Sequence, residues 1–377
     1  SRMIPLNRPT RTGKEIDYIR QAIESGSLQG GGRFTQKCME WMEKKFSASK
    51  VLLTSSGTAA LDMAAYLCSI QPGDEVILPS FTFSSTAVAF ARVGAKLVFV
   101  DICPETMNCD ADAIEKALTV KTKVIVVMHY AGVACDMEKV MCLAKDRGIL
   151  IVEDAAHGFM STYKGRYLGT IGHFGCYSFH DTKNYTMGEG GALVINDRNF
   201  IERAEILWEK GTNRSKFIRG MVDKYTWVDM GDSYLPSELN AAFLIPQLEK
   251  ADLIFRDRLE SWERYFDRLK ELMLCGNIQL PSIPEDCGHN AHIFYIKTGT
   301  CEHRDRLMDF LKAKGICTAF HYLPLHKSPA GLKYGRFAGE DHFTSYESER
   351  LLRLPIYYGM ESKTIDYIVK AIFQFYG

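Results

Sequence analysis

A single lysine stands where this sequence changes from apolar residues to a run of glycines. The stretch SFHDTKNYTMGEGGALVIND (residues 178–197) carries Lys183 between an apolar segment and the glycines of Gly188–Gly191. A lysine on a turn between elements is usually solvated, and this stretch taken alone favours that interpretation. A lysine with an ordinary pKa of about 10.4 is also a poor nucleophile at neutral pH. Chemistry would require a lowered pKa, or a lysine held as an imine by a carbonyl cofactor.

A helix opens directly after an apolar run in TSSGTAAL, residues 54–61. The free N–H groups and the dipole at a helix start favour a phosphate, and Gly57 would allow it a close approach. Capping of the helix by Ser56 or Thr58 explains the same pattern equally well. This stretch therefore indicates a phosphate site only in combination with others.

Two further stretches end apolar runs with side chains that often meet ligands. ILIVEDAAHG ends its run in Glu153 and Asp154, which would either contact a ligand or cap the next helix. PSFTFSST carries Phe81 and Phe83, and such aromatic residues are more often core than partners of a flat cofactor. Each stretch alone leaves the two interpretations open.

Together, these stretches hold the parts that pyridoxal phosphate requires. Its phosphate needs helix N–H groups and hydroxyls, its ring nitrogen an acid partner, its ring a flat face and its aldehyde an amine. No metal is expected, because the ten histidines are scattered, with no H-E-x-x-H and no cysteine pair at ligand spacing. His321 and His326 in HYLPLH are more typical of a polar binding surface than of a metal site.

Short apolar runs alternate with helical stretches through the first half of the chain. The predicted strands are Glu75–Leu78, Lys96–Asp101, Lys123–His129 and Ile149–Asp154. The predicted helices are Lys14–Ser25, Gly57–Cys68, Ser84–Val93, Ala111–Ala117 and Met137–Arg147, with a loop at Ser27–Thr35. This alternation predicts a doubly wound α/β domain with a parallel sheet and a site at the carboxyl ends of its strands.

The second half of the chain has a different texture. A long helical region, Pro236–Leu274, comes first, with a kink or break expected at Pro246. The elements predicted beyond it are strands at Ala291–Thr298 and Ile316–Phe320 and helices at His303–Lys314 and Tyr346–Leu352. We therefore predict a large α/β domain with an N-terminal segment over residues 1–254 and a smaller α+β domain over 255–377.

The bulk composition excludes several classes of partner. Lys+Arg and Asp+Glu both number 46, so no net charge attracts nucleic acid or an anionic membrane. No run approaches the roughly 20 apolar residues that span a bilayer, and the first residues show no signal pattern. Eleven cysteines without a C-x-x-C indicate free thiols in a reducing compartment. We expect a soluble cytoplasmic protein.

Eight ordered motifs resemble the DegT/DnrJ/StrS family of sugar aminotransferases. They are SSGTAAL, PGDEVILPSFTF, GAKLVFVD, VEDAAHG, SFHDTKN, GEGGALVIND, HYLPLH and LRLPIYY. The resemblance covers essentially the whole chain. It implies a pyridoxal-phosphate-dependent transferase of fold type I, like aspartate aminotransferase, that passes through a pyridoxamine phosphate form. It also implies a homodimer with shared active sites.

Three stretches resemble one branch of this family more narrowly: MHYAGVACDM, STYKGRYLGTIGH and residues 209–239. That branch transfers an amino group from L-glutamate to C4 of dTDP-4-keto-6-deoxyglucose and makes dTDP-4-amino-4,6-dideoxygalactose for surface polysaccharide such as lipopolysaccharide. The alternatives are amination at C3 or C4 of another keto sugar linked to dTDP, GDP or UDP, and a non-enzymatic sensor of phosphate ligands. A branch that dehydrates sugars commonly replaces the lysine with histidine, and Lys183 argues against it.

The resemblance assigns catalytic roles by matched position. Lys183 would hold the cofactor's aldehyde, and Asp154 would pair with the ring nitrogen. Phe83 would stack on the ring, and His157 would lie near the ring substituents. The glycines that follow Lys183 would let the chain turn tightly beside the bound cofactor.

The resemblance also assigns the phosphate and substrate contacts. Gly57, Thr58 and Ser178 would hold the phosphate. Many relatives add an asparagine from the partner subunit in a G-Y-N-Y-R-M setting, where this chain has GDSYLP with Ser233. A serine can still donate a hydrogen bond, but its shorter side chain reaches less far. The candidates for substrate binding are His321, Tyr322 and His326.

Overall fold

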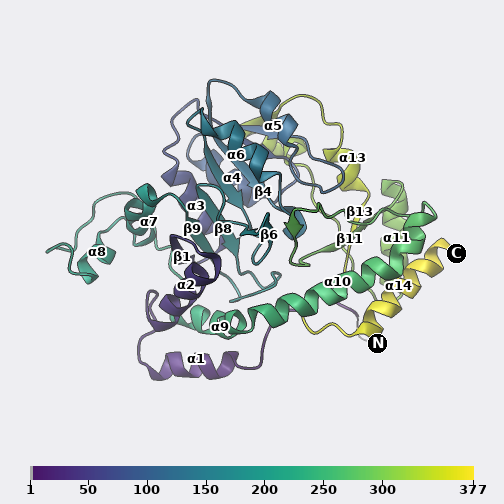
Figure 1. The fold of residues 1–377 in the computed structure, drawn as a ribbon, viewed down its shortest axis with the longest axis horizontal. Helices are drawn as coiled ribbons and strands as arrows, with labels where there is room; N and C mark the ends of the chain where they lie inside the picture. Colours follow the sequence, from purple (N-terminus) through teal and green to yellow (C-terminus); the bar gives the residue numbers. More distant parts are fainter. Residues whose placement is uncertain (1–2) are drawn as a thin grey trace.

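An eight-stranded sheet forms the centre of the molecule, with strand order β1-β9-β8-β5-β4-β2-β3-β12 (Figure 1). In chain order the strands are β1 (Lys50–Thr54), β2 (Glu75–Pro79), β3 (Lys96–Val100), β4 (Thr122–Met128), β5 (Leu150–Asp154), β8 (Phe174–Ser178), β9 (Gly191–Ile195) and β12 (Gly335–Phe337). Strand β9 runs antiparallel to both of its neighbours, and the other pairs are parallel. The computed structural model describes residues 3–377.

Both faces of this sheet are apolar, because successive residues of a strand alternate between two cores. In β2, Val76 and Leu78 belong to one core, and Ile77 between them belongs to the other. The first core also includes helices α3 (Gly57–Leu67) and α4 (Ser84–Arg92), and the second includes α5 (Ala111–Ala117) and α6 (Met137–Lys145). This is the doubly wound α/β arrangement that the sequence predicts.

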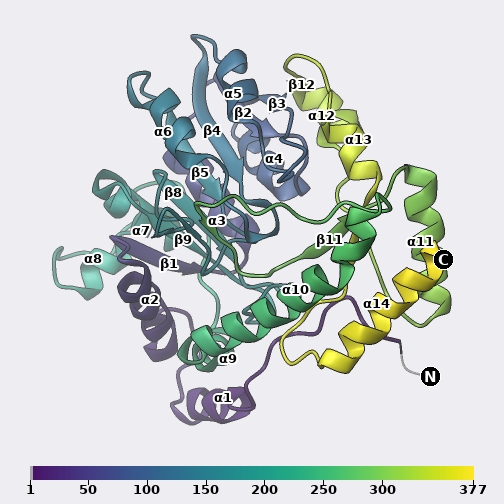
Figure 2. The same ribbon diagram turned by 45° about the vertical axis from the view of Figure 1, so that its right-hand side comes forward.

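A separate hydrophobic core lies beside the large sheet (Figure 2). Its elements are α10 (Ala251–Leu274), β11 (Phe294–Lys297), α11 (Cys301–Ala313), β13 (Leu351–Leu354) and α14 (Ser362–Tyr376). Strands β11 and β13 pair antiparallel, and α14 packs on α10 and α11. The smaller unit is thus an α+β arrangement in which helices pack on a two-stranded sheet.

The remaining elements flank these two cores. The helices are α1 (Glu15–Glu24), α2 (Arg33–Phe46), α7 (Ile201–Trp208), α8 (Arg214–Ile218), α9 (Glu238–Glu249), α12 (Pro329–Tyr334) and α13 (Thr344–Glu349). The strands β6 (Thr162–Tyr163), β7 (Arg166–Tyr167) and β10 (Cys287–Gly288) form a small sheet. Short 3₁₀ turns lie at Tyr130–Gly132, Arg198–Phe200 and Leu325–Lys327. Within residues 3–377, no helix has the length and apolarity needed to cross a membrane.

The strands and helices predicted between residues 57 and 154 are all present, with ends that agree within two residues. Two other predictions are wrong in detail. Helix α2 already begins at Arg33, inside the stretch predicted as loop. No break occurs at Pro246, which is buried inside helix α9; the helix ends at Glu249, and Lys250 separates it from α10.

Two predictions in the smaller unit are corrected by pairing between distant segments. Residues 316–320 form no regular strand and make single bridges, from Ile316 to Ile4 and from Ala319 to Arg353. The helix predicted over 346–352 ends at Glu349, and the chain continues as β13 because Leu352 pairs with Ile296 of β11. Sequence periodicity does not reveal such pairings.

The predicted domain boundary after residue 254 stays a prediction. In its support, the large core includes Ile254 and the small core begins its share of α10 at Trp262. Helix α10 crosses the boundary without interruption, and β12 returns from the C-terminal third to pair with β3. Strand β12 thus adds a strand from the C-terminal third at the edge of the large sheet, and α10 links the two cores.

Helix α2 owes its start to a carboxylate from a distant helix. Its N-cap, Gly32, has no side chain to offer. Glu238 of α9 accepts hydrogen bonds from the backbone N–H groups of Phe34 (2.8 Å) and Thr35 (3.2 Å) and from the Thr35 hydroxyl (2.9 Å). A Cβ at position 32 would lie 2.6 Å from the Glu238 Oε1 atom, so only glycine leaves room for this cap. The cap therefore joins α2 to α9.

We predict that Glu238→Ala destabilises the fold by about 2–4 kcal/mol, because three buried donors lose a charged acceptor. The measurement is the midpoint of urea unfolding followed by circular dichroism. Glu40→Ala, on the exposed face of α2, is the matched control and should leave the midpoint unchanged. Equal midpoints for the two variants would contradict the role of the cap.

Candidate active site

A cavity of about 380 Å³ opens where β4, β5 and β8 end and α3 begins. The last residues of these strands, Met128, Asp154 and Ser178, line it. The predicted site residues that line it are Gly57, Thr58, Phe83, Asp154, His157, Ser178, Lys183, His321 and Tyr322. Residues more than 250 positions apart in sequence thus meet in one space.

Two predicted site residues lie outside this cavity. The ring of His326 lies between the hydroxyl of Ser80, at 2.6 Å, and a carboxylate oxygen of Asp341, at 3.1 Å, and it does not face the cavity. Ser233 is exposed and bridges to Glu209. The role predicted for Ser233 concerns the cavity of a second copy of the chain, so it stays a prediction.

The N-terminus of α3 forms one wall of the cavity. Ser56 caps the helix by accepting a hydrogen bond from the N–H of Ala59 at 2.9 Å, so the capping interpretation of this stretch is confirmed. The next two residues, Gly57 and Thr58, line the cavity beside it. A Cβ at Gly191 would lie 2.6 Å from the Gly57 nitrogen, so this glycine lets β9 approach the first turn of α3.

Asp154 is buried, and its carboxylate accepts few hydrogen bonds. The Thr86 hydroxyl donates to its Oδ2 at 2.6 Å, and the N–H of Ala156 donates to its Oδ1 at 3.2 Å. Burial raises the pKa of this carboxyl, and the Thr86 hydrogen bond, the Ala156 hydrogen bond and the charge of Lys183 offset part of the effect. The carboxylate would be stabilised by a further positively charged donor in the cavity.

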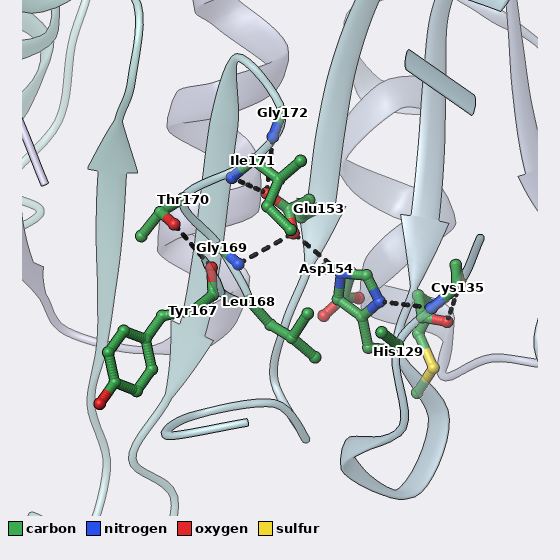
Figure 3. Close-up of polar contacts among 12 residues, drawn as sticks. His129, Cys135, Glu153, Asp154, Tyr167, Leu168, Gly169, Thr170, Ile171 and Gly172 are labelled. Atoms are coloured by element: carbon green, nitrogen blue, oxygen red, sulfur yellow. Dashed lines mark hydrogen bonds and ion pairs between the residues drawn. The ribbon is translucent and has the colours of Figure 1, made fainter. Parts of the chain in front are cut away.

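Glu153 precedes Asp154 in β5 but belongs to a different network (Figure 3). Its carboxylate accepts hydrogen bonds from the backbone N–H groups of Gly169 (2.9 Å), Ile171 (2.8 Å) and Gly172 (2.7 Å), and His129 Nε2 lies 2.9 Å from it. Although burial opposes ionisation, His129 and these N–H groups hold the pKa of Glu153 below its usual value. Glu153 fastens the loop before β8 to the sheet and does not line the cavity.

Lys183 lies in the loop that follows β8 and faces the cavity. Burial lowers its pKa from 10.5 to about 8; the nearby charge of Asp154 opposes this shift, and Arg353 adds to it. At neutral pH the neutral amine is therefore far more abundant than in an ordinary lysine. A lowered pKa is one of the two conditions under which a lysine can act as a nucleophile at neutral pH.

The two aromatic residues of PSFTFSST occupy different environments. Phe81 is buried and packs edge-on against Tyr130 and Tyr322. Phe83 is 61% exposed and lines the cavity at the start of α4. An exposed ring at the wall of a cavity is available to a flat ligand, whereas Phe81 is core.

His157 is held as a neutral ring. The N–H of Ala131 donates to its Nδ1 at 3.1 Å, which leaves the ring proton on Nε2, 3.3 Å from the Tyr322 hydroxyl. Burial lowers the pKa of His157 well below its usual value, and the charge of Lys183 adds to this effect. The ring therefore offers a fixed hydrogen-bonding edge and no charge.

The cavity also contains residues that we did not predict from the sequence. Thr86 orients Asp154, and His292 lies beside His157 with ring centroids 4.5 Å apart. Arg353, in the quoted motif LRLPIYY, lines the cavity from β13. Thr86 could have been found three residues after Phe83 on the same helical turn, but no local signal marks His292 or Arg353.

These residues fit pyridoxal phosphate. Asp154 lacks a charged donor and could accept one from a protonated ring nitrogen. The start of α3 and Ser178 could hold the phosphate, as Gly191 allows the strands to close around that turn. Phe83 offers a face and Lys183 an amine. This agreement rests on the donor set of the cavity, and the individual roles stay predictions.

We predict that Lys183 in the cofactor-free protein reacts with acetic anhydride with a midpoint near pH 8, because only the neutral amine is nucleophilic. Below pH 8 the rate should rise tenfold per pH unit, and above it the rate should level off. At pH 8 Lys183 should react roughly a hundredfold faster than the same residue in the urea-unfolded chain, where the ordinary pKa holds. Peptide mass spectrometry measures the label.

The variant Asp154→Asn serves as an internal control for this titration. It removes the charge that raises the pKa of Lys183, so the midpoint should move below pH 8. A midpoint near 10.5 in the folded protein would contradict the burial argument. An unchanged midpoint in the variant would show that Asp154 does not act on the lysine.

We also predict that neutralising the two neighbouring carboxylates has different effects: one substitution lowers the turnover rate and the other lowers the unfolding temperature. Asp154→Asn should keep the unfolding temperature close to that of the wild type and lose most of the turnover rate. Glu153→Gln should lower the unfolding temperature, because an amide replaces an acceptor that serves three N–H donors. Calorimetry and single-turnover rates measure the two effects. A near-wild-type rate in Asp154→Asn would show that the assigned carboxylate is wrong.

Comparison with known proteins places the chain in a family. Residues 9–373 match the model of the DegT/DnrJ/EryC1/StrS aminotransferase family. The chain is 32% identical over 375 residues to GDP-perosamine synthase of Escherichia coli O157:H7, and the alignment covers 99% of each protein.

Solved structures agree with this placement. An aminotransferase, TlmJ, of Streptoalloteichus hindustanus superposes with a TM-score of 0.90 at 29% identity, over 99% of each chain. A proposed sugar aminotransferase of Streptococcus pneumoniae, solved in PLP and PMP forms, superposes with TM-scores of 0.87 and 0.88 at 26% identity, over 99% of this chain and 98% of that one. The fold predicted from the sequence, that of a type I pyridoxal-phosphate-dependent transferase, is confirmed. The chain therefore belongs to the DegT/DnrJ/EryC1/StrS aminotransferase family and is a pyridoxal-phosphate-dependent sugar aminotransferase.

Proposed function

We propose that this enzyme transfers an amino group from L-glutamate to C4 of dTDP-4-keto-6-deoxyglucose. The product would be dTDP-4-amino-4,6-dideoxygalactose, a precursor of surface polysaccharide such as lipopolysaccharide. The observation that carries the amino-transfer chemistry is Lys183, a buried lysine with a lowered pKa that shares its cavity with the carboxylate of Asp154. The three stretches of the narrower resemblance support the choice of sugar and nucleotide.

A second candidate substrate is a keto sugar linked to GDP. GDP-perosamine synthase, at 32% identity over nearly the whole chain, favours it. Both candidates react at a carbonyl carbon of the sugar, and they differ in the nucleotide that the sugar carries.

Pyridoxal phosphate, when bound, supplies an electron sink for negative charge on the carbon that carries the transferred amine. In the proposed mechanism, Asp154 would accept a hydrogen bond from the ring nitrogen and so would keep a proton on that atom. Thr86 fixes the carboxylate in this orientation through its 2.6 Å hydrogen bond. The burial of Asp154 would strengthen this pairing, because opposite charges attract more strongly where water is excluded.

Lys183 acts as the general base and acid. Once its Nζ atom is free, it would take the proton from the Cα of glutamate, and in the second half-reaction it would deliver a proton to C4 of the keto sugar, the carbon that receives the amine. A pKa near 8 suits both directions, because the amine is partly neutral and partly protonated at physiological pH. Because the pKa of His157 lies well below its usual value, its ring stays neutral and does not take this proton in place of Lys183.

The same proposal includes a homodimer with shared active sites. Helix α8 and its flanking loops project from the body of the molecule (Figure 1) and expose large apolar side chains such as Met221 and Trp227, which is 74% exposed. Ser233 follows on the same segment, so docking of this segment on a second copy would bring it near that copy's cofactor phosphate. Sedimentation of the enzyme at assay concentration tests the dimer.

A cytoplasmic location also remains part of the proposal. All eleven cysteines lie in the described part of the chain and carry free thiols. Buried thiols such as Cys38 and Cys176 have pKa values raised by burial and persist without oxidation in a reducing compartment. Cell fractionation with detection of the native protein tests the location.

We predict turnover of L-glutamate with dTDP-4-keto-6-deoxyglucose, at a kcat/KM at least tenfold above that with GDP-linked or UDP-linked keto sugars. Mass spectrometry of the sugar product measures the amine, and nuclear magnetic resonance of the product gives the position and configuration of the amine. The variant Lys183→Ala should abolish multiple turnover, because no amine remains to move the proton.

Each outcome separates one part of the proposal. Preference for a GDP-linked sugar would replace the substrate and keep the chemistry. Sustained turnover by Lys183→Ala would overturn the catalytic assignment. Absence of turnover with every keto sugar, together with intact binding of phosphate ligands, would favour the sensor alternative.

A further inference from the structure

The residue that follows Lys183 is a buried asparagine whose side chain reaches a distant segment. Nδ2 of Asn184 donates to the carbonyl of Asn290 at 2.9 Å, and its Oδ1 lies 2.8 Å from Nδ1 of His292. A carbonyl only accepts, so the amide turns its Nδ2 toward Asn290, and His292 must donate from Nδ1. Both ends of this amide are therefore used in one contact between the loop after β8 and residues 290–292.

The segment that Asn184 binds is itself held by helix α10. Arg258 donates to the carbonyls of Ala291 (3.3 Å) and His292 (2.9 Å), and Trp262, one turn along the helix, donates to the next carbonyl at 3.1 Å. Both of these donors are buried. Three successive carbonyls thus receive hydrogen bonds from one helix, and this gives Asn184 a fixed partner.

A second hydrogen bond holds the backbone of Asn184 from the other side. The Thr10 hydroxyl donates to the carbonyl of Asn184 at 2.8 Å. Gln247 of α9 completes the arrangement, because its Nε2 donates to the carbonyl of Thr10 (2.8 Å) and its Oε1 accepts from the N–H of Thr186 (2.9 Å). These four polar side chains are buried. The loop that carries Lys183 is therefore fastened by the N-terminal segment, by α9 and by residues 290–292.

Asn290 also bonds to another wall of the cavity. Its Nδ2 donates to the carbonyls of His157 (2.7 Å) and Phe159 (2.9 Å). Lys183 and His157 come from different loops of the large sheet, and the same short segment is bonded to both loops. A buried polar network whose members are paired fixes one arrangement of the chain. The two cavity residues are thus set relative to one another.

The amine of Lys183 depends on this arrangement for its place. Within residues 3–377 it makes no hydrogen bond, and the charges that act on it are those of Asp154 and Arg353. Neither charge fixes a direction in the way that a hydrogen bond does. The position of the Nζ atom therefore follows from the backbone that carries the side chain.

We infer that Asn184 is a positioning residue, which holds the backbone of Lys183 so that the amine keeps its place when it is not bound to the cofactor. This inference rests on the proposed function, in which Lys183 moves a proton once its Nζ atom is free. A displacement of about 1 Å at a reacting group can cost roughly 100-fold in rate. Asn184 itself does not line the cavity, so its loss should change the rate of proton transfer and not the binding of substrates.

The test compares Asn184→Ala with the matched control Asn196→Ala. Asn196 also uses its amide for two hydrogen bonds, from Nδ2 to the carbonyls of Gly169 (2.9 Å) and Gly172 (2.8 Å), and it lies outside the cavity. Both variants should lower the unfolding temperature. Thr10→Val removes only the bond to the backbone of Asn184 and keeps a branched side chain, and it carries the same test with a smaller effect if Asn184→Ala does not fold.

The first readout is the acetylation of Lys183 in the cofactor-free protein, followed by peptide mass spectrometry. A loosened loop lets water reach the amine, so in Asn184→Ala the midpoint should move upward from about 8. The charges of Asp154 on β5 and Arg353 on β13 are the same in every variant. Asn196→Ala should keep the midpoint of the wild type.

The second readout is the single-turnover reaction of the cofactor-loaded enzyme with L-glutamate. Asn184→Ala should slow this reaction by about 10- to 100-fold and change the apparent Kd of glutamate by less than about threefold. With glutamate deuterated at Cα, the isotope effect should be at least as large as in the wild type, because the slowed step is the proton transfer. Asn196→Ala should match the wild type in rate and isotope effect.

The outcomes separate positioning from stability. If Asn184→Ala lowers only the unfolding temperature, as the control does, its role is structural and the inference is overturned. A slower reaction with a reduced isotope effect, or a loss confined to glutamate binding, would overturn it as well. If the wild type does not react with glutamate, the proposed donor fails, and the acetylation midpoints of the cofactor-free variants still decide the role of Asn184.

Discussion

Two adjacent carboxylates at the end of β5 serve opposite sides of the sheet, because successive side chains of a strand alternate. Glu153 receives three backbone N–H groups and a histidine, and it fastens the loop before β8. That loop leads into the strand whose end carries Ser178. Asp154, on the other side, faces the cavity with only two donors. The cavity depends on this division, since one carboxylate builds its frame and the other is left for a ligand.

The cavity keeps several polar groups in a buried state with few partners. Such groups are unfavourable in a fold unless they are hydrogen-bonded or paired. Here Asp154 has a raised pKa, Lys183 a lowered one, and Arg353 a bare Nε atom. The large sheet tolerates them because its strands and helices bury two continuous apolar cores. A bound cofactor and its substrates would supply the missing partners.

The smaller unit completes the site and does not merely flank it. His321 and Arg353 reach the cavity from the C-terminal third, while Asp154 and Lys183 come from the large sheet. Connections such as β12 beside β3, and the continuous helix α10, hold the two units together. A shift of the smaller unit would move His321 and Arg353 relative to the cavity. Asp154 at the end of β5 and the start of α3 would stay in place.

The sequence by itself determined the alternation of strands and helices through residue 154, the family and the two central residues Lys183 and Asp154. Local periodicity and ordered motifs carry that information, because it depends on near neighbours in the chain. Tertiary structure decided the start of α2, where Glu238 supplies a cap from 200 residues away. It also decided that Glu153 lies outside the cavity, that His326 contacts Asp341, and that Arg353 lines the cavity. These features depend on contacts between side chains of elements that are far apart in the sequence, and residue spacing along the chain does not predict such contacts.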